Sequence, residues 1–451
     1  MIMLPNKIIL IFGIEFRISQ YLGKFAMVST HVLISLPDSI LMAGTFARLI
    51  ALERLLPRSN IMPRQSHVFA QFLHLLPRYE FQRMVNKYQG DYRTKHFKCW
   101  DQLACMMFAH IRQEDSLRDI DIALNAHATK LYHIGIEQCP RSTLADANER
   151  RDYRIYEEFA KSLMQRARRH YAQTELAVEV DNAVYALDAS TIDLTLSLFP
   201  WAKFRKTKGA IKLHAMLDLR GNIPAFLTIT DGKVHDVKAA PLVPIEPEGI
   251  YVVDRAYVDF AWLRSIEQIG AFFVTRLKTS IKWTRVVSHP VDKSLGLRCD
   301  QEILLASKRL KKLYPIRLRR ISFRDETQDR TLVFLTNSFM LSAETIAALY
   351  KARWEIELFF KWIKQNLRIK TFYGTSANAV KTQIWIAMIV YLLLAILKER
   401  YDLQEPLSKL LHFLEVNLFE QKPLISTFYT NARRTRHEQK IEDRQLKLFD
   451  L

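Results

Sequence analysis

Apolar residues recur every three or four positions from about residue 66 to residue 169, with little alternation of the β type. This spacing predicts a run of amphipathic helices. Two stretches also carry the pattern that begins a helix, Ser116 with Asp119 and Thr143 with Asp146. The first part of the chain is therefore expected to be helical.

The segment after Gly135 predicts a turn followed by a polar and basic helix, CPRSTLADANERR. A helix, a short turn and a second polar helix are typical of a helix-turn-helix, whose second helix enters the major groove of DNA. Arg141 and Ser142 would stand at the start of that helix, where phosphate is favoured. A plain helical bundle with a basic exterior fits the same pattern equally well.

After Ala183 the pattern changes to short apolar runs. A buried strand is predicted for AVYALDAS, ending at Asp188 and Ser190, and a hairpin is predicted to follow, turning at residues 220–222. A further strand is expected in GIYVVD, ending at Asp254, with the helix FAWLRSIEQIG and the strand AFFVTRL after it. Neighbouring strands followed by alternating helices and strands predict a mixed α/β sheet.

Residues 278–330 are dense in charge and interrupt this order, which predicts a β-rich insertion. The sheet then resumes with TLVFLTN, and Ser342 is placed to cap a long helix. The apolar run at residues 384–397 is shorter than the roughly 20 residues that span a bilayer. We expect it to be a buried helix.

These patterns divide the chain into six parts. They are a poorly defined leader (1–61), a helical DNA-binding domain (62–175), the first part of an α/β catalytic domain (176–277), a β-rich insertion (278–330), the second part of the catalytic domain (331–400) and a helical basic tail (401–451). The leader is apolar without a clear period and ends in the Pro-punctuated stretch PRSNIMPRQS. We expect translation to start at Met62 or the leader to be dispensable. A genuine helical element docked on the next domain is the alternative.

Charge narrows the class of partner. The 451 residues include 66 Lys and Arg against 47 Asp and Glu, a formal net charge of +19. Such a surplus indicates that the binding partner is a polyanion. Nucleic acid is favoured over an anionic membrane surface, because the basic residues are spread out rather than gathered in an amphipathic stripe. Four scattered cysteines without a C-x-x-C pair argue against a zinc ribbon or a disulfide framework. A basic, solvated surface without a partner has the same composition.

Candidate chemistry lies at two predicted strand ends and on one predicted helix. Asp188 and Asp254 end apolar strands at the sheet edge where α/β proteins bind ligands, although an aspartate there also serves as a turn residue or a cap. At about 100° per residue, one helix would place four side chains within about 60° of arc. They are Tyr350, Arg353, Glu357 and Lys364. A solvated face, on which Glu357 pairs with Arg353 or Lys361, is the alternative.

These residues resemble a known family. The spacing Tyr350-x2-Arg353-x3-Glu357-x6-Lys364 matches the Y-x2-R-x3-E-x6-K signature of DDE transposases of insertion-sequence-four type. LDAST and VVDRAY are similar to the first and second aspartate blocks of that family. The upstream stretches FAQFLHLLP, KCWDQLACMMFA, SLRDID and RSTLADANERRDYR are similar to the helical N-terminal region of one of its branches. The resemblance covers about residues 66–397.

The resemblance implies a ribonuclease-H-like catalytic domain that cuts DNA at terminal inverted repeats and joins the ends to target DNA. Asp188, Asp254 and Glu357 would be the catalytic and metal-binding residues, with Mg²⁺ as cofactor and Mn²⁺ able to substitute. Arg353, Lys364 and Tyr350 would contact backbone phosphate. The expected state is a homodimer on nucleoid DNA in the cytoplasm.

The resemblance also implies a hairpin intermediate. In such an intermediate Trp283 would stack on an extruded base, although a tryptophan in the insertion's own small core is the alternative. A stand-alone nuclease of the same fold and a non-catalytic DNA-binding regulator remain alternative functions.

Overall fold

The computed structural model describes residues 8–11, 14–17, 26–28, 66–136, 139–325, 329–367, 369, 371–425 and 428. The chain divides into two compact units, Met1–Pro63 and Arg64–Leu451. The described part of the first unit is a three-stranded antiparallel sheet of β1 (Ile8–Ile11), β2 (Ile14–Arg17) and β3 (Ala26–Val28). Most of the predicted leader, its Met62 start and the end of the predicted basic tail lie outside the described residues.

The second unit begins with helices, as the apolar spacing predicted. They are α2 (Val68–His74), α3 (Arg78–Lys87), α4 (Cys99–Arg112), α5 (Leu117–Asn125), α6 (Ala128–Leu131), α7 (Arg141–Arg150) and α8 (Arg154–His170). Ser116 caps α5 by accepting a hydrogen bond from the Asp119 N–H, which confirms the first predicted helix start.

The second predicted helix start is wrong. α7 begins at Arg141 behind Pro140, so Thr143 lies inside the helix and caps nothing. Pro140 has φ −60°, and a proline has no N–H that would need a partner at a helix entry. The connection from α5 to α7 is also longer than one short turn, because α6 and a 3₁₀ turn at Tyr132–Ile134 lie between them.

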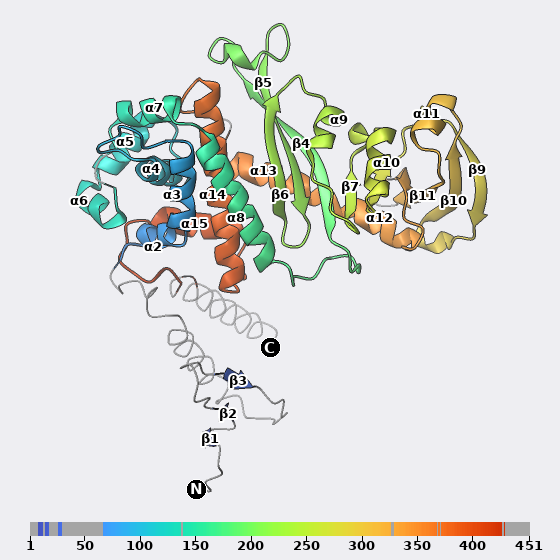
Figure 1. Ribbon diagram of the computed structural model, residues 1–451, viewed down its shortest axis with the longest axis horizontal. Coiled ribbons are helices and arrows are strands. Elements are labelled where there is room, and N and C mark those ends of the chain that lie inside the picture. Colours follow the sequence, from blue (N-terminus) through green and yellow to red (C-terminus); the bar gives the residue numbers. More distant parts are fainter. Residues whose placement is uncertain are drawn as a thin grey trace, which may run out of the picture. The chain divides into compact units, whose positions relative to one another are not determined.

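Beside the helical region, the second unit contains a nine-stranded sheet in the order β6-β5-β4-β7-β8-β12-β11-β10-β9, which ends at β9 on the right of Figure 1. Its first five strands are β4 (Val184–Leu194), β5 (Gly209–Asp218), β6 (Ile223–Asp231), β7 (Ile250–Val253) and β8 (Phe272–Arg276). β4, β7 and β8 run parallel, and β5 and β6 form the predicted hairpin, which turns through left-handed Gly221 and Asn222. This arrangement is the expected ribonuclease-H-like mixed sheet.

The predicted insertion continues the same sheet. It contributes β9 (Trp283–His289), β10 (Leu297–Leu305), α11 (Lys308–Leu313) and β11 (Leu318–Asp325), and β12 (Arg330–Thr336) follows. β12 pairs antiparallel with both β11 and β8, so the open edge of β8 carries the insertion strands (Figure 1).

Helices cover both faces of the sheet. One face packs on α8, α12 (Ala343–Ala352), α13 (Trp354–Asn366) and α14 (Ala377–Arg400). The opposite face packs on α10 (Phe260–Gln268) and on the insertion helix α11, with the short α9 (Asp236–Ala239) nearby. α15 (Leu407–Asn417) packs against α14 and α4.

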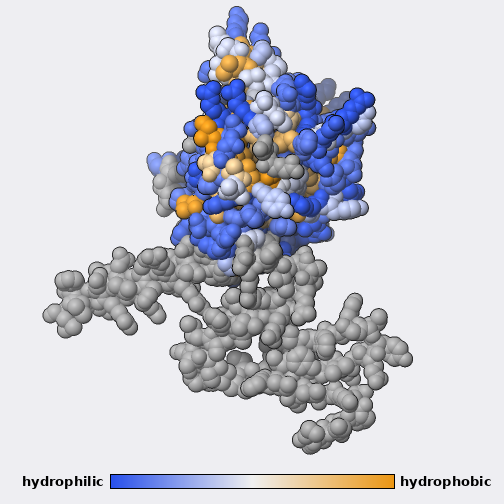
Figure 2. All heavy atoms as spheres, turned by 90° about the vertical axis from the view of Figure 1, so that its left-hand side faces the viewer, coloured by the Kyte–Doolittle hydropathy of each residue, from blue (hydrophilic) through white to orange (hydrophobic). Residues whose placement is uncertain are grey.

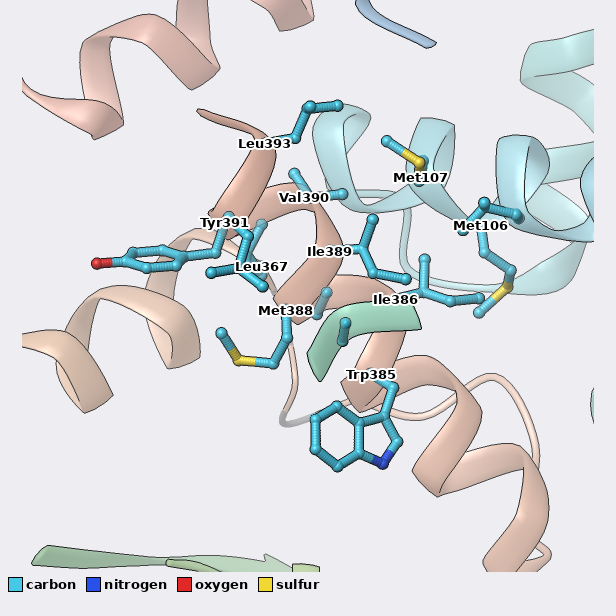
Figure 3. Packing of buried hydrophobic residues seen from close by; sticks show 14 of the residues in the cluster. Met106, Met107, Leu367, Trp385, Ile386, Met388, Ile389, Val390, Tyr391 and Leu393 are labelled. Atoms are coloured by element: carbon cyan, nitrogen blue, oxygen red, sulfur yellow. The ribbon is translucent and has the colours of Figure 1, made fainter. Parts of the chain in front are cut away.

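α14 is apolar all round, which is typical of a helix buried in a core. It is the one helix among the described residues that is long and apolar enough to cross a membrane, and 94% of its apolar stretch is buried. Figure 3 shows its side chains pointing in all directions, with Met106 and Met107 of α4 beside Ile386 and Val390. The prediction of a buried helix is therefore confirmed, and α14 joins the helical region to the sheet.

Candidate active site

Two neighbouring strands bring Asp188 and Asp254 together. The parallel pairing of β4 with β7 ends at Leu187 opposite Val253, so Asp188 is the next residue in β4 and Asp254 is the residue directly after β7. Hydrogen-bonded strands lie about 4.8 Å apart. Side chains alternate along a strand, so both aspartates share the sheet face on which α12 and α13 pack.

The strand that carries Asp188 does not end there, contrary to the sequence-based prediction. β4 runs on to Leu194, because its other edge stays paired with β5 as far as Leu194 opposite Gly209. Asp188 is thus the point at which β4 loses its parallel neighbour and keeps its antiparallel one. Asp254 does end its strand, and it caps the turn Arg255–Tyr257 by accepting a hydrogen bond from the Ala256 N–H at 3.0 Å.

The predicted single helix with four aligned polar side chains is wrong. α12 ends at Ala352 and α13 begins at Trp354, with Arg353 between them. Around this residue the hydrogen bonds join residues three apart, from the Arg353 N–H to the Tyr350 carbonyl and from the Ile356 N–H to the Arg353 carbonyl. Arg353 keeps helical dihedral angles, φ −54° and ψ −26°. The sequence next to it contains no glycine or proline, so nothing in the residue types marks the break.

Arg353 joins two of the three predicted catalytic carboxylates. Its Nη1 donates to Asp188 Oδ2 at 2.9 Å, and its Nη2 donates to Glu357 Oε1 at 2.6 Å. The arginine side chain is only 12% exposed, so these ion pairs are shielded from water. The ion pair between Glu357 and Arg353, which helical spacing had left open as an alternative, is therefore present. Arg353 also pairs with Asp188, a contact that helical spacing could not predict.

The acidic groups also act on one another. The pKa of Asp188 is raised to about 6, chiefly by burial and also by the nearby charges of Asp254 and Glu357. The Ala189 N–H, which donates to Asp188 at 2.7 Å, and the Arg353 guanidinium oppose this shift. Three carboxylates and one arginine thus form one electrostatic cluster.

A cleft of about 470 Å³ opens between β4 and α13. Its lining combines acidic, basic and neutral polar side chains with one phenylalanine: Asp188, Ala189, Ser190, Glu357, Phe360, Lys361, Lys364 and Gln365. Lys364 also donates from Nζ to the carbonyl of Thr191 at 2.9 Å, which ties α13 to β4. Paired carboxylates beside lysines can hold a divalent cation and a phosphodiester in the same place.

Carboxylate oxygens are the ligands that Mg²⁺ and Mn²⁺ prefer, so the donor set of Asp188, Asp254 and Glu357 fits such ions. In the described part of the chain, no three His, Cys, Asp or Glu side chains already converge as a metal cluster. The Arg353 guanidinium lies between Asp188 and Glu357 and pairs with both.

The other predicted site residues lie apart from the cleft lining. Tyr350 is 9% exposed and packs on Phe334, with ring centroids 5.1 Å apart, and the Arg353 guanidinium lies 5.7 Å from its ring centre. Arg141 and Ser142 are exposed in the first turn of α7.

Trp283 lies at the start of β9, half-buried against the apolar cluster on the α10 face. The Arg320 guanidinium lies 4.6 Å from the centre of its ring. Its surroundings resemble those of a packed side chain more than those of an open stacking platform.

Sequence reasoning missed Lys361 as part of the cleft. The signal was present, because Lys361 follows Glu357 by one helical turn and precedes Lys364 by three residues, and residues so spaced share a helix face. It was considered only as a surface ion-pair partner. The bridging role of Arg353 had no local signal, since it depends on a strand 165 residues earlier.

A mixed sheet with adjacent aspartates, facing a glutamate on a helix, defines the class of DDE-type DNA-processing enzymes. Residues 181–393 match the family described as Transposase DDE domain, and residues 64–137 match DUF4372, a domain of unknown function. The chain is 35% identical over 285 residues to y4zB of Sinorhizobium fredii, a protein assigned as a transposase, covering 62% of this chain and 78% of the relative. This chain belongs to the DDE transposase family and is a DNA transposase.

The chain is also similar to two further proteins. A protein assigned as the transposase of insertion sequence element IS5377 of Geobacillus stearothermophilus is 30% identical over 238 residues, covering 52% of this chain and 62% of that protein. The solved synaptic complex of piggyBac transposase with hairpin DNA aligns at a TM-score of 0.41 and 9% identity, over 80% of this chain and 82% of that one. Catalytic domains of this family generally depend on a divalent metal.

Proposed function

We propose that this chain moves an insertion sequence of insertion-sequence-four type by cut-and-paste transposition. A homodimer would bind the terminal inverted repeats in the cytoplasm, cut at the ends of the element and join the 3′ ends to target DNA. The observation that carries the proposal is the cluster of Asp188, Asp254 and Glu357 beside a cleft that also holds Lys361 and Lys364. Membership of the DDE transposase family supports it.

In this proposal Asp188, Asp254 and Glu357 hold Mg²⁺, or Mn²⁺ in its place. Bound divalent ions activate the attacking oxygen and stabilise the leaving oxygen of an in-line phosphoryl transfer. Arg353 orients Asp188 and Glu357 through its two ion pairs and competes with a cation for the same oxygens. Tyr350, being buried, would act through Arg353 rather than on DNA, since a ring face attracts a nearby guanidinium.

The basic side chains of the cleft would hold the substrate. Lys361 and Lys364 would bind backbone phosphate next to the scissile bond, and the exposed start of α7, with Arg141 and Ser142, would bind phosphate in the terminal repeat. α7 is the part of the predicted helix-turn-helix that remains available for DNA. Trp283 carries no role in this proposal, because its ring is packed against its own cluster.

The test uses the purified full chain and the DNA that flanks its gene, searched for imperfect inverted repeats. With Mg²⁺, a duplex carrying such a repeat should be cut at its boundary, and the cut end should join a plasmid target. Cleavage without end preference or joining would indicate a stand-alone nuclease. Specific binding without cleavage in Mg²⁺ or Mn²⁺ would indicate a DNA-binding regulator.

Replacing Lys364 by Gln should weaken binding to the terminal repeat and reduce its salt dependence. Loss of one phosphate contact lowers the slope of log binding constant against log salt concentration by about 0.9. Lys351→Gln is the matched control, because Lys351 is an exposed lysine on the preceding helix, outside the cleft lining. Equal slopes for wild type and Lys364→Gln would show that Lys364 only ties α13 to β4.

A further inference from the structure

The connection between β4 and β5, residues 195–208, projects beyond the sheet and forms the highest point of the described second unit in Figure 1. At the same height in Figure 2, hydrophilic residues surround a small apolar patch. The tip carries four exposed basic side chains within six positions: Lys203, Arg205, Lys206 and Lys208. None of the four forms an ion pair with another residue that the structure describes.

This tip is held in shape by its own backbone. The N–H groups of Phe204 and Arg205 both donate to the Lys208 carbonyl at 2.9 Å, and Lys203 forms a bridge with Gly209. These bonds close the backbone that carries the four basic residues into a turn. A backbone turn that is already formed loses less conformational entropy when its side chains bind a partner.

Aromatic side chains anchor the projecting segment to the segment that follows α13. The Trp201 indole N–H donates to the Thr375 carbonyl at 2.6 Å, and the Phe199 and Phe372 rings lie 6.1 Å apart in an edge-to-face arrangement. Glu357, a proposed catalytic residue, lies on α13, which ends at Asn366, a few residues before this anchor. A tip meant only for solubility needs no such anchor.

The same strand links the tip to the catalytic cluster. From Asp188 to Leu194, β4 extends roughly 20 Å at about 3.3 Å per residue. Lys361 and Lys364 line the cleft on this side, and Lys364 contacts β4 at Thr191. Duplex DNA carries a charge about every 1.7 Å along its axis, so a duplex leaving the cleft along β4 would bring many phosphates to the tip.

Opposing charges near the tip are few. The exposed carboxylates of Asp193 and Asp231 lie at its base, near the ends of β4 and β6, and exposed Lys233 follows Asp231. The tip therefore keeps a strong positive surplus. A concentrated surplus of this kind on a rigid projection fits a polyanion with closely spaced phosphates.

We infer that the β4–β5 tip is a second DNA contact, which clamps the backbone of duplex DNA on its path to or from the cleft. This inference rests on the proposed function, since it takes the cleft as the place of cleavage. The bound chemistry is the phosphodiester backbone. It can belong to the terminal repeat itself or to the DNA beyond its boundary, and the experiment separates the two.

The test replaces all four tip residues by Gln: Lys203→Gln, Arg205→Gln, Lys206→Gln and Lys208→Gln. A matched control replaces three lysines and one arginine that are exposed on α11: Lys308→Gln, Arg309→Gln, Lys311→Gln and Lys312→Gln. Both variants lose the same charge. Their thermal unfolding should match wild type, because exposed side chains without ion-pair partners contribute little to stability.

Binding is measured against salt concentration on three duplexes. One has a random sequence, one carries the terminal repeat ending at its boundary, and one carries the repeat with flanking DNA. The tip variant should lose up to about 3.6 from the slope of log binding constant against log salt, at about 0.9 per contact, while the α11 variant keeps the wild-type slope. If the salt slope falls on both repeat duplexes, the tip contacts the repeat. If the slope falls only on the duplex with flanking DNA, the tip contacts the flanking DNA.

Two outcomes would overturn the clamp. In the first, the tip variant keeps the wild-type salt slope on every duplex. If the wild-type chain still cleaves the repeat duplex, the proposed function is unaffected by this result. The other is an equal loss in the α11 variant, which would reduce the effect to net charge. A wild-type chain that binds none of the duplexes would remove both the clamp and the proposed function.

Discussion

Replacing Asp254 by Asn should lower metal-dependent strand cleavage by about a thousandfold or more, while binding to the terminal repeat persists. A metal ligand contributes several kcal/mol to the charged transition state, and each 1.36 kcal/mol corresponds to about a factor of ten in rate. Asp188→Asn and Glu357→Gln should behave alike. The measurement is cleavage of an end-labelled repeat duplex in Mg²⁺, with binding followed separately by mobility shift.

Among the three, Asp254→Asn is the cleanest variant, since Arg353 forms ion pairs with Asp188 and Glu357, whereas Asp254 accepts a hydrogen bond from the Ala256 N–H. Asp193→Asn serves as the control, because Asp193 is an exposed carboxylate farther along β4 whose position in the alternation places it on the opposite sheet face. Near-normal cleavage by any of the three variants would remove that residue from the catalytic set.

Replacing Arg353 by Gln should destabilise the protein when no divalent metal is present, and Mg²⁺ should restore much of the loss. Without the guanidinium, Asp188 and Glu357 face each other and Asp254 uncompensated. The loss in unfolding free energy should be about 2 kcal/mol, between the values for exposed and for buried ion pairs. A ligand that binds only the folded state stabilises it, so the variant should gain more from Mg²⁺ than wild type does.

The measurement is the thermal midpoint with EDTA and along a Mg²⁺ series. Arg319→Gln is a suitable control, because Arg319 is a buried arginine in the insertion that pairs with one carboxylate, Asp300, at 2.7 Å. It should lose stability without recovering it in Mg²⁺. The same Mg²⁺ response in both variants, or none in Arg353→Gln, would contradict a cation site at Asp188 and Glu357.

Local patterns in the sequence were sufficient for much of the fold. Three-and-four spacing predicted the helices from α2 to α8, and apolar runs with a turn at residues 220–222 predicted the β5–β6 hairpin. Ser116 and Ser342 were identified as caps because a cap depends on residues only three positions away. α14 could be recognised as a core helix from its composition alone.

The candidate catalytic residues were also readable in the sequence, as residue types at fixed spacing. Asp254 follows an apolar strand, and Arg353, Glu357 and Lys364 keep helical spacing within about three turns. Chemistry that is encoded as a motif survives small errors in the predicted elements. The site was therefore proposed even though the helix that was thought to carry it is two helices.

Only the tertiary structure decided where the elements end and which of them meet. β4 passes Asp188 because β5 supplies hydrogen bonds as far as Leu194, and a strand's length depends on its neighbours rather than on its own residues. The break at Arg353 coincides with ion pairs to Asp188, 165 residues away, and to Glu357. Tyr350 became a core residue because β12 placed Phe334 against it. Such contacts join distant parts of the chain, so local periodicity contains no information about them.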